Sequence, residues 1–132
     1  MKTIMKFGLF SLMAIFLLIG CKKDENKLIG KWECTYIDEY YYDFWDDDYV
    51  SLKGVPSDLG YSVTLEFIDN EKGIKTLTYR GQPQLQEFRY TYSDNLLSDG
   101  KLTYNVTFSG KTMNMSAVVG DEHMKYTYKK IK

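Results

Sequence analysis

Residues 61–67 read Tyr-Ser-Val-Thr-Leu-Glu-Phe, and apolar and polar side chains alternate through the whole stretch. In an extended strand successive side chains point to opposite faces, whereas a helix would place its apolar residues three or four positions apart. One face of this stretch therefore carries the large apolar residues, which are Tyr61, Val63, Leu65 and Phe67. The pattern predicts a strand with one buried and one exposed face.

The same alternation recurs from Leu28 to the end of the chain. The residues that share a face in each further run are Gly30, Trp32, Cys34 and Tyr36; Leu77 and Tyr79; Phe88, Tyr90 and Tyr92; Leu102, Tyr104, Val106 and Phe108; Met113, Met115 and Ala117; and Met124, Tyr126 and Tyr128. Turn-forming residues separate the runs at 69–73, 98–100, 109–111 and 120–121. These signals predict one all-β domain over residues 28–132, an antiparallel up-and-down meander of about seven or eight strands that closes into a small barrel. Two packed sheets are the alternative.

The N-terminal segment has the composition of an export signal. Lys2 and Lys6 precede an apolar stretch at 7–19, which is short for a membrane span. The following Leu18-Ile19-Gly20-Cys21 resembles a lipobox, the pattern of bacterial lipoproteins. The resemblance implies a lipoprotein signal peptide at 1–20, lipidation of Cys21 and a membrane anchor made of acyl chains. An ordinary cleaved signal peptide or an uncleaved membrane helix would be the alternatives.

Residues 21–27 hold the cysteine and a charged, polar tether. Within it, Lys23-Asp24-Glu25 resembles the signal that sends some lipoproteins of Gram-negative bacteria to the cell surface. We therefore expect a lipid-anchored protein of the outer membrane that is exposed at the cell surface. An anchor that faces the periplasm is the alternative.

The charge balance argues against nucleic-acid binding. The chain has 17 Lys and Arg against 18 Asp and Glu, and Lys2 and Lys6 are lost with the signal peptide. Recognition of nucleic acid normally requires a basic face, whereas the densest charge cluster here is acidic. We expect no nucleic-acid partner.

We expect no enzyme, no cofactor and no metal. Once Cys21 is lipidated, Cys34 is the one remaining thiol. Cys34 shares a strand face with Trp32, which predicts that it is buried as a small hydrophobic residue. An intermolecular disulfide or a reactive thiol is the alternative. His123, the single histidine, falls in an expected turn and is predicted to be solvated. The chain shows no nucleophile with a base beside it and no glycine loop for phosphate, so we predict no catalytic residues.

A family resemblance supports the barrel. The Gly-x-Trp core of Leu28-Ile29-Gly30-Lys31-Trp32 resembles the first strand of a lipocalin, and the order of the other runs is similar to that of small lipocalin-like domains of bacterial lipoproteins. The further matching segments are Leu65-Glu66-Phe67 with Gly73, Tyr90-Thr91-Tyr92, Leu102-Thr103-Tyr104 and Tyr126-Thr127-Tyr128-Lys129-Lys130. The resemblance implies that Trp32 packs at the closed barrel end beneath a basic side chain of the last strand, with Lys130 in that place.

The same resemblance implies a non-catalytic binding domain with a small apolar ligand inside the barrel. The interior residues expected to contact it are Tyr36, Phe67, Phe88 and Tyr90. A core largely filled by side chains is the alternative.

Residues 38–49 combine acids and aromatics in equal number. Repulsion among the carboxylates predicts an exposed loop or an edge strand, and large aromatics near water are typical of recognition surfaces. The predicted surface residues are Tyr42, Trp45, Asp46, Asp47 and Asp48. We consider four hypotheses for this segment. It binds a basic protein partner, a glycan or calcium, or it is a solvated extension without a partner.

Overall fold

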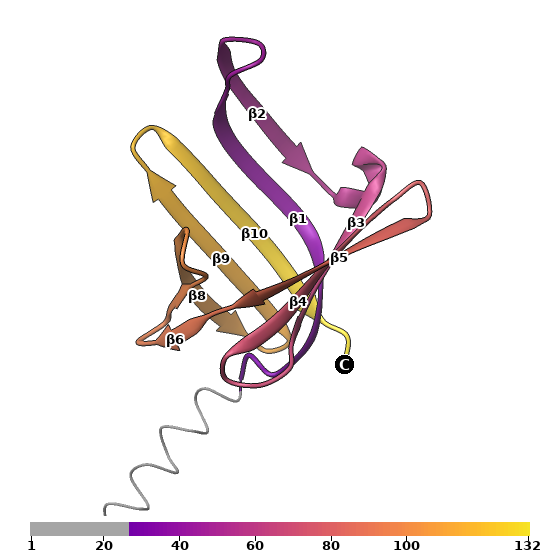
Figure 1. The fold of residues 1–132 in the computed structure, drawn as a ribbon, viewed down its shortest axis with the longest axis vertical. Coiled ribbons are helices and arrows are strands. Elements are labelled where there is room, and N and C mark those ends of the chain that lie inside the picture. The colour runs from indigo at the N-terminus through magenta and orange to yellow at the C-terminus, as the bar shows by residue number, and fades with distance from the viewer. Residues whose placement is uncertain (1–26) are drawn as a thin grey trace, which may run out of the picture.

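The computed structural model describes residues 27–132 (Figure 1). The predicted signal peptide, the lipidation site at Cys21 and all of the tether but its last residue lie outside the described residues. The described part of the chain holds ten strands and one 3₁₀ helix: β1 (Gly30–Asp43), β2 (Asp48–Gly54), η1 (Pro56–Leu59), β3 (Tyr61–Phe67), β4 (Lys72–Tyr79), β5 (Gln82–Arg89), β6 (Thr91–Ser93), β7 (Leu96–Ser98), β8 (Thr103–Ser109), β9 (Thr112–Val119) and β10 (Glu122–Lys130). In this part no helix has the length and hydropathy needed to cross a lipid bilayer.

All these strands belong to one antiparallel sheet, which confirms the predicted all-β meander. The strand order is β5-β4-β3-β1-β10-β9-β8-β7-β6, with β2 beside β1. The sheet curls into a half-barrel, in which β3, β4 and β5 form one wall and β8, β9 and β10 face them (Figure 1). The path ends at β5 and β6, and no strand pairing joins these two strands.

Strand β1 connects the two walls of the half-barrel, because it pairs with β3 of one wall and with β10 of the other. Its first residues pair with β3 and its later residues with β2, while β10 lies along its other side. The segment beyond Ile37 therefore projects as a β1–β2 hairpin at the top of the molecule (Figure 1). We call this hairpin, residues 38–54, the arm.

The core lies on the concave face of the sheet. Its largest fully buried side chains are Trp32, Phe67, Leu28, Met113, Val106 and Pro56. Those that lie in strands, Trp32, Phe67, Val106 and Met113, come from the faces that the alternation predicted, because each strand directs every second side chain inward. Leu28 precedes β1, and Pro56 lies in η1. The indole Nε1–H of Trp32 donates a hydrogen bond of 2.9 Å to the backbone oxygen of Leu28.

Lys130 covers Trp32 from the last strand, as the family resemblance implied. The ammonium Nζ of Lys130 lies 5.6 Å from the centroid of the indole ring, within the range of a cation–π contact. Gly30 makes this approach possible: its φ is +132°, and a Cβ there would lie 2.9 Å from Lys130 Cε and 3.0 Å from the backbone oxygen of Lys132. The glycine of the Gly-x-Trp motif is therefore required by backbone conformation and by close packing.

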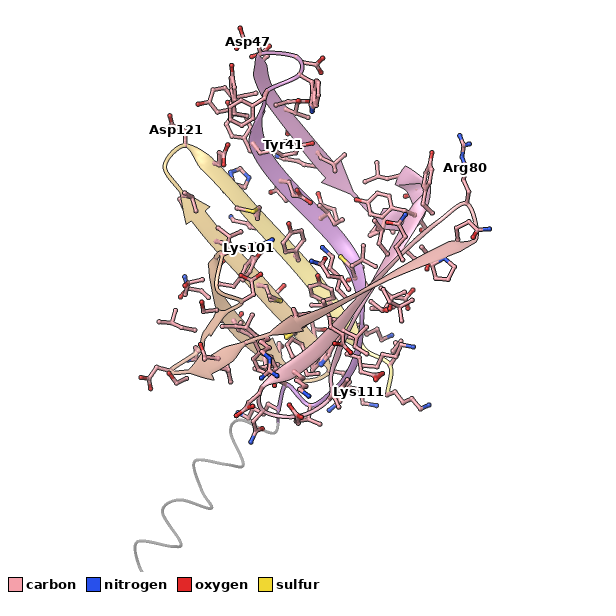
Figure 2. All side chains as sticks on the ribbon, in the orientation of Figure 1. Tyr41, Asp47, Arg80, Lys101, Lys111 and Asp121 are labelled. Carbon is pink, nitrogen blue, oxygen red and sulfur yellow. The ribbon has the colours of Figure 1, made fainter. Side chains whose placement is uncertain are left out.

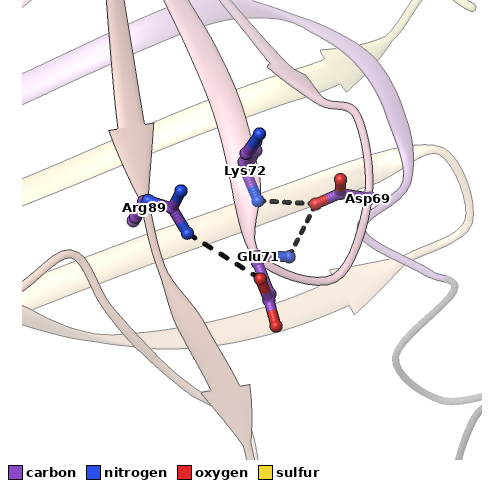
Figure 3. A network of polar contacts seen from close by, with 4 residues as sticks. All are labelled: Asp69, Glu71, Lys72 and Arg89. Carbon is purple, nitrogen blue, oxygen red and sulfur yellow. Dashed lines mark hydrogen bonds and ion pairs between the residues drawn. The ribbon is translucent and has the colours of Figure 1, made fainter.

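The turn between β3 and β4 differs from the prediction. Gly73 was expected in the turn, but it lies in β4, directly beneath the ring of Phe88. The turn is instead organised by Asp69, whose Oδ1 accepts hydrogen bonds from the backbone N–H groups of Glu71 (2.8 Å) and Lys72 (2.7 Å) (Figure 3). An ion pair of 3.8 Å between Arg89 and Glu71 ties the exposed edge of β5 to this turn (Figure 3).

The run predicted over Phe88, Tyr90 and Tyr92 is divided in the structure. Strand β5 ends at Arg89 and β6 begins at Thr91, so Tyr90 stands between two strands with different partners. A short hairpin, β6–β7, was not predicted. Its turn at Asp94 and Asn95 has φ values of +51° and +63°, a conformation that these two residue types tolerate better than most.

Candidate functional site

A cavity of about 530 Å³ occupies the inside of the half-barrel. Its wall is formed by side chains from β1, β3, β4, β5, β7, β8, β9 and β10 together with the segment between β7 and β8. The residues lining it are Cys34, Ile37, Glu39, Tyr61, Val63, Leu65, Phe67, Lys75, Leu77, Tyr79, Gln86, Phe88, Leu97, Asp99, Lys101, Tyr104, Met115, Tyr126 and Tyr128. Most of them are apolar or aromatic, and a few charged groups stand among them, which is the usual composition of a site for a small organic molecule. Side chains therefore fill the buried core and leave space on the concave face beside it.

A β-bulge in β1 decides which residues of that strand face the cavity. Cys34 pairs with Tyr128 and Tyr36 with Thr127, so the register shifts between Cys34 and Tyr36. The extra residue reverses the inward and outward alternation, and Ile37 points inward at 3% exposure while Tyr36 is 44% exposed. The prediction that Tyr36 lies on the interior face is therefore wrong, because strict alternation fails at a bulge.

Two of the other predicted interior residues line the cavity and one does not. Phe67 and Phe88 form part of the wall, with ring centroids 5.8 Å apart in an edge-to-face arrangement. Tyr90 is buried but does not line the cavity; it packs against Phe67 at 5.1 Å between centroids. Its hydroxyl donates to the backbone oxygen of Asp69. Tyr90 therefore supports the wall and the β3–β4 turn.

Burial keeps the hydroxyl and thiol groups of the wall uncharged. It raises the pKa of the Cys34 thiol to about 11 and that of the Tyr104 hydroxyl to about 12. The pKa values of Tyr126 and Tyr128 are also raised, in both cases mainly by burial. The predicted burial of Cys34 is confirmed, and its thiol is a poor nucleophile because it holds its proton well above neutral pH.

Glu39 is the charged group that the sequence reasoning did not assign to the interior. It follows the bulge with the same parity as Ile37, and its carboxylate accepts a hydrogen bond from the Tyr126 hydroxyl. Burial is the main cause of the raised pKa values of Tyr61 and Tyr104, and the negative charge of Glu39 contributes to both. Both rings line the same cavity as Glu39. The register shift at the bulge, which is seen in the strand pairing, accounts for its inward position.

The arm carries the predicted surface residues. Tyr40 and Tyr49 stack across its two strands at 5.1 Å between ring centroids, and Tyr42 packs edge-on against Tyr49 at 5.4 Å. The Tyr42 hydroxyl donates to a carboxylate oxygen of Asp47, whose φ of +51° places it in the tight turn. The rings therefore stabilise the arm. The prediction of an exposed loop or edge strand is confirmed for the exposed turn 44–47 and for Asp48 and Tyr49 in β2, which pairs only with β1. It is wrong for residues 38–40, which lie in β1 between β2 and β10.

At the tip of the arm the aromatic rings lie in water. Trp45 is 96% exposed and Phe44 86% exposed, and the exposed acids Asp46, Asp47 and Asp48 follow directly (Figure 2 labels Asp47 at the top). The tip thus brings together the residues predicted for surface recognition. Tyr42 is the exception, since its ring is partly buried between its neighbours.

His123 is not the solvated turn residue that we predicted. It lies in β10, where its Nε2 is 3.1 Å from Asp38 Oδ1 and its ring stacks on Tyr40 at 5.9 Å between centroids. The contact with His123 lowers the pKa of the Asp38 carboxyl. This pair fastens the base of the arm to the last strand.

Within residues 27–132, no group of three or more His, Cys, Asp or Glu side chains is arranged to hold a metal ion. No protein-family model matches this chain, and no curated protein sequence matches it. The function must therefore be argued from the cavity and the arm.

Proposed function

We propose that this protein is a non-catalytic, lipid-anchored binding protein that holds a small apolar molecule inside its half-barrel. The observation that carries the proposal is the cavity of about 530 Å³ with a mainly apolar and aromatic wall. This volume lies within the range of sites that enclose drug-sized ligands. The proposal includes the anchor at Cys21 and display at the outer membrane surface, supported by the lipobox and the Lys23-Asp24-Glu25 segment.

The binding test uses the fragment 27–132, because the core cluster and all the strand partners described above lie within it. Circular dichroism should show a β-sheet spectrum for this fragment. Native mass spectrometry of material purified without detergent should then reveal a bound compound, or the empty fragment should take up an apolar fluorescent dye. A folded fragment that holds nothing and excludes such dyes would refute the proposal.

A pair of matched variants locates the site. Leu77→Trp places a larger ring in the cavity wall, since Leu77 is a lining residue of β4. Leu85→Trp makes the same change on the neighbouring strand β5 at a side chain that is 67% exposed and outside the lining. We expect Leu77→Trp to weaken dye binding at least about tenfold and Leu85→Trp to leave it unchanged. Equal effects would mean that the dye binds elsewhere.

The anchor is tested separately. Metabolic labelling with palmitate should mark the wild-type protein and not Cys21→Ser, and protease treatment of intact cells should remove the surface-exposed domain. Labelling that survives in Cys21→Ser would contradict the lipidation site. A domain that resists the protease on intact cells but not on lysed cells would place it on the periplasmic side.

The exposed tip of the arm favours a second function, the docking of a basic protein partner. Trp45 supplies an aromatic anchor, and the neighbouring carboxylates supply attraction to positive charge. Changing Asp46, Asp47 and Asp48 to lysine should abolish capture of such a partner from the protein's own cells and leave the fold intact. Capture that is unchanged would refute this function, and retention of a glycan by the wild-type tip would assign the surface to sugar binding instead.

A further inference from the structure

The cavity contains one carboxylate with few partners. Glu39 is half-buried, and within residues 27–132 no salt bridge reaches it. The other lining acid, Asp99, already accepts hydrogen bonds from the backbone N–H groups of Lys101 and Leu102, both 2.9 Å long. Glu39 accepts one from Tyr126. A partly desolvated carboxylate without a counter-charge is unfavourable, so Glu39 is the group in this wall that gains most from a cation.

Neither of the two lysines that line the cavity, Lys75 and Lys101, forms a salt bridge with Glu39. Lys75 and Lys101 are both exposed, and a long lysine side chain keeps its ammonium in water while its stem lies along the wall (Figure 2 labels Lys101). The acids of the wall are thus withdrawn from solvent, whereas the bases are not.

Three tyrosine rings line the same cavity as Glu39. Tyr61, Tyr104 and Tyr126 all line the cavity and all feel the charge of Glu39, and the rings of Tyr104 and Tyr126 lie 6.3 Å apart between centroids. The face of an aromatic ring attracts cations, and groups of such rings are used to recognise quaternary ammonium ions. A negative charge and several ring faces in one wall reinforce each other.

We propose that the ligand of this cavity carries a cationic head, an ammonium or quaternary ammonium group, on its apolar body, and that Glu39 is the residue that selects it. The inference rests on the proposed binding function and specifies its ligand class. The apolar part of the ligand contacts the floor formed by Val63, Leu65 and Phe67, and the head lies between Glu39 and the tyrosine rings.

The test compares three probes with the same ten-carbon chain: decyltrimethylammonium, decanol and decanoate. Each displaces an apolar dye from the fragment 27–132 below its micelle concentration. We expect the cation to bind about tenfold more tightly than decanol, and decanoate to bind more weakly than decanol. Glu39→Gln, which keeps the shape of the side chain, should bring the cation and decanol to nearly equal affinity.

Glu33→Gln is the matched control. It removes one negative charge from the same strand at an exposed residue outside the lining, so the preference for the cation should persist. Equal binding of decanol and the cation by the wild-type fragment, or a preference that survives Glu39→Gln, would overturn the inference and leave the proposed function standing. If none of the three probes displaces the dye, and no dye binds, the proposed function itself fails.

Discussion

Gly73→Ala is expected to destabilise the fold through one neighbouring ring. Gly73 lies in β4 opposite Phe88, and a Cβ at this position would lie 2.7 and 2.8 Å from the two Cε atoms of that ring. Carbon atoms pack comfortably from about 3.5 Å, so the ring must move by roughly 1 Å. Phe88 cannot move freely, because it packs edge-on against the buried Phe67.

The magnitude follows from two opposing effects. Crowding a packed side chain costs about 1–3 kcal/mol, and replacing a strand glycine by alanine stabilises by about 0.5–1 kcal/mol. The net loss is about 1 kcal/mol of unfolding free energy, or about 4–8 °C in melting temperature for a domain of this size. Urea denaturation of the fragment 27–132 followed by far-ultraviolet circular dichroism measures it.

The sign of the effect should reverse when the ring is removed. In a Phe88→Ala background the new Cβ meets no ring, so Gly73→Ala should be neutral or should stabilise by up to about 1 kcal/mol. The double-mutant cycle therefore predicts a coupling energy of about 1–3 kcal/mol. If Gly73→Ala lowers stability equally in both backgrounds, the reasoning is refuted, and the glycine is required for a reason other than Phe88.

Three further predictions concern single side chains. Lys130→Met keeps an apolar stem over Trp32 but removes the charge, so it should lower the unfolding free energy by about 0.5–1 kcal/mol in urea denaturation. Lys130→Arg keeps the charge and should keep the stability. Equal stability of the Met variant and the wild type would exclude the cation–π contact. Burial raises the pKa of the Cys34 thiol from about 9 to about 11, so the folded state favours the protonated thiol. The contribution of this thiol to the unfolding free energy is therefore full below pH 9 and is lost as the pH rises through 11. The stability difference between wild type and Cys34→Ala should therefore shrink by on the order of 2 kcal/mol over that range, and a difference that does not depend on pH would contradict it. Trp45→Ala should change the unfolding free energy by less than about 0.5 kcal/mol because its ring is 96% exposed, and a larger loss would show that the ring packs against the arm in solution.

Local alternation was sufficient to predict most of the sheet. Residues 61–67 form β3 with the predicted face inward, and the runs at 113–117 and 124–128 behave in the same way. The Gly-x-Trp motif and Lys130 meet because β1 and β10 are paired with Trp32 opposite Lys130. Signals of this kind are carried by a few neighbouring residues and can be read without knowing the rest of the fold.

The site was less accessible to prediction because it depends on irregularities. The bulge between Cys34 and Tyr36 moved Tyr36 out of the interior and brought Glu39 into it, and an inserted residue leaves no mark in an alternating pattern. The break at Tyr90 has a tertiary cause, since its hydroxyl and its ring are held by the β3–β4 turn and by Phe67. The turn at Asp94 and Asn95 could have been predicted from its composition.

The two ends of the sheet path, β5 and β6, are separated along the chain by Tyr90 alone and are not joined by a ladder of backbone hydrogen bonds. In a closed barrel the circumference is fixed by the number of strands and their stagger. Here β5 and β6 are connected through Tyr90, and no ladder of hydrogen bonds between them fixes the circumference. The width of the interior is therefore not set by strand pairing along this side of the sheet.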